Sequence, residues 1–325
     1  MKRVLRKLFV DKKRIASLSA SEESTPLFDT IYFEVRTRCN STCSFCAAAI
    51  HSETRPDTNL PETLYKKSIN ELAEVAYTGR VAYHVNNDPL LFTDLPTYVK
   101  YASDKLPNAR IQVLTNGLAL NLKKATTLID SGINELTVNC YTDDTETLNR
   151  WKKMSTLESE WAVLGRFPQK YTRIAEYLIS HYGLEGKQSP FSIKSPPNSH
   201  FKDFEYSFLP SRLTTIKTNR AGTAPNKRDT RVEQNGFCEY PFTQFNVTTD
   251  GRVSKCCADL YFEDVMGNIK DQTIMDIWAS DQFSAVRKKL LVGRRENLGQ
   301  CHGCDFYGVK NVNSLAGRVL RKFGI

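Results

Sequence analysis

The sequence contains no apolar run close to the ~20 residues that cross a bilayer, and no secretory signal. We therefore expect a cytoplasmic protein in a reducing setting, where its nine cysteines serve metals rather than disulfides. At 325 residues the chain is long enough for one large and one smaller domain without covalent staples.

Acidic residues are scarce at the two ends. Residues 1–14 contain one acid and carry a net charge of +6, and residues 309–325 contain none and carry +4. Together these segments account for the whole formal charge of +9 and leave the body at −1. A nearly neutral body argues against a basic nucleic-acid groove, so we predict no nucleic-acid partner.

Both basic ends also carry apolar residues at helical spacing. These are Val4, Leu5, Leu8 and Phe9 in the segment 1–27, and Leu315, Val319, Leu320 and Phe323 in the tail 309–325. Two alternatives follow for such amphipathic segments. They can dock on an anionic surface, which would place the protein peripherally at the inner membrane surface, or they can pack on the protein body.

Three cysteines, Cys39, Cys43 and Cys46, follow an apolar run at residues 30–35. Thiolates this close cannot all pair as disulfides, but they can bind three irons of a [4Fe–4S] cluster and leave the fourth iron open for chemistry. The alternative is a zinc loop or a chance cluster. Zinc sites usually use Cys-x2-Cys pairs and a fourth protein ligand.

The spacing Cys-x3-Cys-x2-Cys, with Phe45 before the third cysteine, resembles the cluster loop of the radical SAM superfamily. The resemblance implies an open iron that is chelated by the amino and carboxylate groups of S-adenosylmethionine. It also implies that an electron from the cluster cleaves this cofactor to a 5′-deoxyadenosyl radical.

From residue 28 the chain alternates extended apolar runs with amphipathic helices, the pattern of an α/β protein with a parallel sheet. We predict strands near 29–36, 80–86, 109–115, 134–140, 190–194 and 204–209, and helices near 60–77, 94–105, 120–132, 143–153 and 168–182. Six such units suit the partial (β/α)6 barrel of the radical SAM family. We place this barrel at 28–222 and a linker at 223–237.

Ligands of such barrels bind at the carboxyl ends of the strands. After the second strand, Asn86-Asn87-Asp88-Pro89 occupies the place of the family's Gly-Gly-Glu-Pro segment, which grips the amino group of S-adenosylmethionine. Both glycines are replaced by asparagine and the acid is one methylene shorter. From this segment we assign only Asn87 and Asp88 to cofactor binding.

Two further strand ends contribute candidates. Thr115-Asn116-Gly117 is similar to a Thr-Asn-Gly found at this place in many radical SAM proteins, and its glycine lets the backbone approach a ligand. Asn139 or Cys140 should face the barrel mouth, depending on register. A buried free cysteine is more often a small hydrophobic residue.

Beyond the linker, residues 238–308 contain Cys238, Cys256, Cys301 and Cys304, and a β-hairpin predicted at 245–255. With the Gly267-Asn268 turn and the helix through Trp278, this region resembles the auxiliary-cluster domain of SPASM and twitch enzymes. The resemblance implies the shorter twitch form, which is a small α+β domain with one [4Fe–4S] cluster on these four cysteines. Four thiolates alone would also permit structural zinc.

The resemblance implies a radical SAM oxidoreductase that abstracts hydrogen from a carbinol carbon of a sugar, polyol or aminocyclitol. The auxiliary cluster would accept an electron to leave a ketone, and a reductant such as flavodoxin or ferredoxin would supply the first cluster. One alternative is an epimerase with Cys257 or Cys140 as hydrogen donor. Others are ribosomal-peptide modification, for which the stretch before the first strand is short, and a non-catalytic iron–sulfur or zinc scaffold.

Overall fold

The computed structural model describes 27–142 except 44, 47 and 49–54, together with 146, 169–186, 192–194, 204–212, 221, and 238–306 except 260, 263 and 292. The two basic ends and the helix predicted at 143–153 lie outside the described residues, apart from residue 146. No helix in the described part is long and apolar enough to cross a membrane. The chain forms two compact units, a larger unit of Thr30–Lys217 and Val247–Arg252, and a smaller unit made of the remainder.

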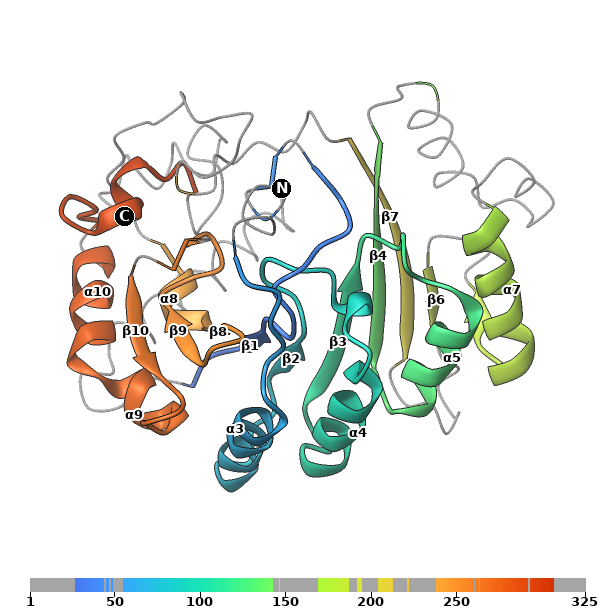
Figure 1. The fold of residues 1–325 in the computed structure, drawn as a ribbon, viewed down its shortest axis with the longest axis horizontal. Helices are drawn as coiled ribbons and strands as arrows, with labels where there is room; N and C mark the ends of the chain where they lie inside the picture. Colours follow the sequence, from blue (N-terminus) through green and yellow to red (C-terminus); the bar gives the residue numbers. More distant parts are fainter. Residues whose placement is uncertain are drawn as a thin grey trace, which may run out of the picture. The chain divides into compact units, whose positions relative to one another are not determined.

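The larger unit is built on a sheet in which five strands run parallel (Figure 1). Their order is β1 (Thr30–Phe33), β2 (Arg80–Ala82), β3 (Arg110–Thr115), β4 (Glu135–Thr142) and β7 (Glu205–Arg212). The order follows the chain, as expected where helices connect neighbouring parallel strands. The α/β class predicted from the sequence is confirmed.

One strand differs from expectation. The run predicted at 190–194 forms β6 (Ser192–Lys194), but β6 runs antiparallel to β7 and pairs with the short β5 (Glu185–Gly186). It is therefore part of a hairpin at the sheet edge and not a further βα unit. Apolar periodicity identifies a strand but carries no information about its direction.

Helices α3 (Glu62–Glu74), α4 (Leu95–Lys105), α5 (Leu122–Asp130) and α7 (Gln169–Tyr182) follow one another along this sheet (Figure 1). Buried tyrosines join α3 and α4 to the sheet. The Tyr65 hydroxyl lies 2.8 Å from that of Tyr83 and donates to the Tyr98 carbonyl, while the Tyr98 ring stacks on Tyr65 with centroids 4.2 Å apart. The tyrosine rings are buried while the Tyr65 hydroxyl keeps its hydrogen bonds, and this combination stabilises the contact of α3 and α4 with the sheet.

The smaller unit contains α8 (Tyr240–Thr243), β8 (Gln244–Val247), β9 (Arg252–Ser254), β10 (Val265–Asn268), α9 (Ile274–Ala279), α10 (Asp281–Leu291) and the 3₁₀ turn η5 (Gly299–Gly303). The predicted hairpin is present as β8 and β9, and its turn with one flanking residue of each strand, Val247–Arg252, belongs to the larger unit. The Arg287 guanidinium lies 3.9 Å from the centroid of Trp278 and donates to two buried carbonyls. It thereby joins α10 to α8 and α9.

Gly117 lies two residues after the end of β3 and adopts the left-handed region, with φ at +78°. A Cβ there would lie 2.6 Å from the Tyr171 hydroxyl and 2.7 Å from Cγ1 of Val138. Gly183, which follows α7, also has a positive φ, but a Cβ there would meet nothing within 4 Å. A side chain at either glycine would strain the backbone, but only one at Gly117 would also meet steric crowding. Comparing substitutions at the two positions therefore separates the two effects.

We expect Gly117→Ala to lower the free energy of unfolding by about 2–4 kcal/mol, because strain and overpacking add. The control Gly183→Ala should cost about 1 kcal/mol, from the backbone alone. Urea denaturation of both variants measures the difference. Equal losses would contradict the crowding that we assign to Gly117.

Candidate active site

The loop that carries the first three cysteines is fastened at both ends to the larger unit. Before the loop, Arg36 donates to both carboxylate oxygens of Asp57, at 2.9 and 2.8 Å, and to the Leu91 carbonyl. Thr37 and Thr58 join the same two segments through a backbone hydrogen bond of 3.0 Å. The ends of the loop are therefore held together independently of its cysteines.

A buried ion pair reinforces this base. Arg55 donates to both oxygens of Glu34 at 2.7 Å, and the Glu34 side chain is fully buried. Burial raises the pKa of Glu34, while Arg55 and the backbone of Thr249 oppose that shift. Removing one partner of such a pair leaves a buried charge uncompensated, which makes the pair a strong constraint on the loop.

Cys39, Cys43 and Cys46 are neighbours within the loop. The Ser41 hydroxyl lies 3.1 Å from the Cys43 sulfur, and the Cys46 N–H donates to the Cys43 carbonyl at 3.0 Å. Burial, together with the nearby Asp88, Cys46 and Cys43, raises the pKa of Cys39 to about 11. Thiolates here need a compensating cation, which bound iron would supply.

Asp88 connects this loop to the end of β3 and to the turn at Leu90. Its N–H donates to the Arg38 carbonyl at 3.1 Å. Its carboxylate accepts from the N–H groups of Leu90 and Asn116, at 3.0 and 2.8 Å, and from the Thr115 hydroxyl, at 2.8 Å. Burial raises the pKa of Asp88, and these donors oppose the shift. The structure thus shows Asp88 as a positioning residue, while its contact with S-adenosylmethionine stays a prediction.

Asn116 brings the end of β3 to the cysteine loop. Its Nδ2 lies 3.7 Å from the Cys39 sulfur and donates to Asn40 Oδ1 at 2.8 Å. Its Oδ1 accepts from the Leu118 N–H at 2.8 Å. The structure therefore places Asn116 beside Cys39, while its role in cofactor binding stays a prediction.

The other predicted residues occupy varied positions. Phe45 is buried, with its ring centroid 5.1 Å from that of Tyr141. The Asn87 side chain turns back to bond Val85 N–H and the Tyr83 carbonyl. Asn139 is half-buried in β4, and the side chain of Cys140 lies outside the described part. Cofactor roles for Phe45, Asn87 and Asn139 stay predictions.

We expect Asp88→Ala to lower the free energy of unfolding by about 3 kcal/mol or more, because three donors lose a charged acceptor. Asp88→Asn should cost less, since one oxygen remains. The exposed Asp94, at the start of α4 without a capping bond, gives the control Asp94→Asn, with little expected effect. Chemical denaturation measures all three, and a fully stable Asp88→Ala would disprove the assigned role.

The smaller unit gathers four cysteines around one cavity. Cys238, Cys256, Cys301 and Cys304 all line it, although they are far apart in the sequence. Burial raises the pKa of each of the four thiols, and Cys257, which adjoins Cys256, raises that of Cys256 further. Such a set of sulfur donors fits a [4Fe–4S] cluster, whose irons would balance four buried thiolates.

Two buried cations in the wall of this cavity were not anticipated from the sequence. Lys255 and Arg295 are 2% and 1% exposed. Lys255 pairs with Asp264 and donates to the Leu298 carbonyl at 3.1 Å, and Arg295 donates to the Cys304 carbonyl at 3.2 Å. Their charges act to lower the pKa of Cys301 against the effect of burial. Both cations therefore favour negative charge in the cavity.

No three metal-binding side chains in the described residues stand close enough in this structure to hold one ion. The assignment of ligands therefore depends on the shared cavity, the loop geometry and the domains to which these cysteines belong.

Comparison with known families identifies those domains. Residues 33–179 match the radical SAM superfamily, and residues 238–305 match the SPASM iron–sulfur cluster-binding domain. The chain therefore carries a radical SAM domain followed by a SPASM-type domain. It is a radical SAM enzyme whose cofactors are S-adenosylmethionine and iron–sulfur clusters.

Among individual proteins, the chain is 26% identical over 284 residues to an S-adenosyl-L-methionine-dependent 2-deoxy-scyllo-inosamine dehydrogenase of Niallia circulans, covering 87% of this chain and 95% of that protein. It is also similar to a crystal structure of BtrN with AdoMet and 2-DOIA, with a TM-score of 0.63, 24% identity, and coverage of 89% and 97%. An open conformation of BtrN gives a TM-score of 0.57 at 23% identity, covering 87% and 94%. These structures establish the shared fold.

We expect Lys255→Met to lower the reduction potential of the auxiliary cluster by roughly tens of millivolts, because a cation beside the cavity favours the more negative, reduced state. Lys255→Arg keeps the charge and serves as control. Redox titration followed by electron paramagnetic resonance measures both potentials. An unchanged auxiliary potential in Lys255→Met would contradict this electrostatic role.

Proposed function

We propose that the protein is a radical SAM dehydrogenase that oxidises a carbinol carbon of an aminocyclitol to a ketone. The observation that carries the proposal is the presence of two separate cysteine sets, one in a loop at the sheet and the other around a cavity with buried cations. The similarity to an aminocyclitol dehydrogenase over 87% of the chain supports the substrate class.

The two cysteine sets would have different roles, one in binding S-adenosylmethionine and the other in accepting an electron. Cys39, Cys43 and Cys46 would hold the cluster that binds S-adenosylmethionine, and Asn116 would position the end of β3 beside them. When bound, the cofactors supply a hydrogen-abstracting radical and an electron acceptor. Lys255 and Arg295 would help the second site to receive the electron that a substrate radical gives up when it becomes a ketone.

The experiment incubates anaerobically reconstituted enzyme, dithionite and S-adenosylmethionine with 2-deoxy-scyllo-inosamine. We expect 5′-deoxyadenosine together with a product lighter by two hydrogens. A product of unchanged mass, or one carrying a single deuterium after reaction in heavy water, would support the epimerase instead. No product with any aminocyclitol, alongside cofactor cleavage, would refute the substrate class.

A pair of cysteine variants separates the two chemistries. We expect Cys304→Ala to keep forming 5′-deoxyadenosine but to lose the ketone, because only the proposed electron acceptor is damaged. Cys257→Ala should retain ketone formation. Quantifying both products by liquid chromatography checks this, and loss of turnover in Cys257→Ala with normal turnover in Cys304→Ala would favour hydrogen donation by a thiol.

Cytoplasmic localisation and membrane contact through the basic ends remain part of this proposal as predictions. Flotation with anionic liposomes, comparing the full chain with a 15–308 truncation, tests the membrane contact. Salt-sensitive binding that requires the ends would support it.

A further inference from the structure

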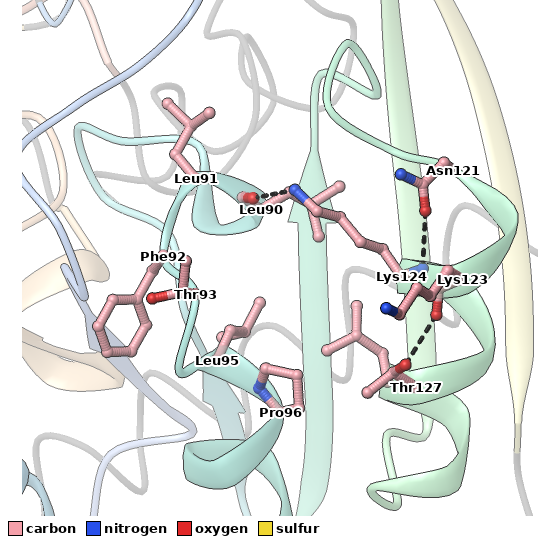
Figure 2. Close-up of a pocket in the computed structure, with 11 residues that line it drawn as sticks. Leu90, Leu91, Phe92, Thr93, Leu95, Pro96, Asn121, Lys123, Lys124 and Thr127 are labelled. Carbon is pink, nitrogen blue, oxygen red and sulfur yellow. Dashed lines mark hydrogen bonds between the residues drawn. The ribbon is translucent and has the colours of Figure 1, made fainter.

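A groove of about 410 Å³ lies between the start of α4 and the start of α5 (Figure 2). Its lining is mostly apolar and includes Leu90, Phe92, Leu95 and Leu128, with Lys123 and Lys124 from α5. Lys124 crosses from α5 to donate to the Leu90 carbonyl at 2.7 Å. The 3₁₀ turn η1 (Pro89–Leu91) therefore forms one wall of the groove and is tied to the other.

The surface beside the groove combines exposed apolar side chains with positive charge. Leu118 and Leu122 are 57% and 39% exposed. Lys123 and Lys170 are also exposed, and Lys170 donates to the Leu118 carbonyl at 3.0 Å. The acidic residue Asp94 stands at the start of α4, next to the groove. The three lysines Lys123, Lys124 and Lys170 outweigh its charge, so the surface is net positive. Exposed leucines beside exposed lysines are suited to an acidic protein partner.

Two short bonded routes lead from this surface to the first cysteine loop. From the groove wall, the Leu90 N–H donates to Asp88, whose own N–H donates to the carbonyl of Arg38, next to Cys39. From Leu118, the N–H donates to Asn116, whose Nδ2 lies 3.7 Å from the Cys39 sulfur. The surface is thus separated from Cys39 by only one or two residues.

We propose that this surface, formed by Leu118, Leu122, Lys123 and Lys170 and the adjoining groove, is the docking site of an acidic one-electron carrier protein that reduces the cluster on Cys39, Cys43 and Cys46. One electron leaves the carrier's reduced centre and one enters the cluster, with no atom transferred. The inference rests on the proposed cluster role of these cysteines. Lysines provide steering, and the leucines provide the small apolar contact typical of transient redox complexes.

The experiment uses the reconstituted full chain and flavodoxin as the probe. Isothermal titration calorimetry gives the dissociation constant, and the growth of the reduced-cluster signal after mixing with flavodoxin hydroquinone gives the reduction rate. We expect Lys123→Glu to weaken binding about tenfold and to slow reduction similarly, with both effects diminishing at high salt. The double variant Leu122→Ser/Lys123→Glu should weaken binding further.

Lys105→Glu is the matched control, because it changes the charge equally at the opposite end of α4, about 15 Å from Leu95. It should bind flavodoxin as the wild type does. Dithionite, which needs no docking surface, should reduce the cluster in every variant at the same rate.

Two failures can be told apart. If dithionite reduces no cluster in the wild type although iron is bound, the cluster assignment fails. If dithionite reduction is normal but Lys123→Glu binds flavodoxin as tightly as Lys105→Glu does, or if the wild type does not bind it at all, the docking surface is wrong.

Discussion

The hydrogen bonds of one buried carboxylate, that of Asp88, hold the candidate active site together. They join η1, the end of β3 and, through the adjacent N–H, the cysteine loop. These three elements are therefore all hydrogen-bonded to the same residue, Asp88. The arrangement resembles the use of an aspartate as a helix cap, but here the cap also determines where the Asn116 amide meets the Cys39 sulfur.

The local patterns of this sequence were sufficient for the class of fold and for the position of the cysteines. Cys39, Cys43 and Cys46 lie within eight residues, so their proximity follows from the chain itself. The alternation of strands and helices similarly predicted β1 to β4. What could not be predicted depends on long-range pairing. The antiparallel direction of β6 is set by its pairing with β7, and the residues of β6 themselves do not indicate this direction.

The same limit applies within the site. The sequence identified Asp88 and Asn87 by their place after a strand, but their partners, Thr115 and the backbone at Tyr83, become visible only in the folded chain. Lys255 adjoins a cysteine and looks like an ordinary polar residue of a hairpin. Its burial depends on Asp264 and Leu298, which no local pattern connects to it. Buried charges are therefore the features that sequence reasoning is least able to find.

The turn of the β8–β9 hairpin has a consequence for how the chain is made. Val247 accepts the Glu34 N–H at 2.8 Å, and Thr249 bonds Thr58 at 3.0 Å, so residues 247–252 complete the larger unit. A ribosome must therefore release residue 252 of 325 before the unit that begins at residue 30 can close. During synthesis the buried Glu34 therefore stays without its contacts to Val247 and Thr249 until this later segment has emerged, and a nascent chain stalled before residue 252 lacks part of the larger unit.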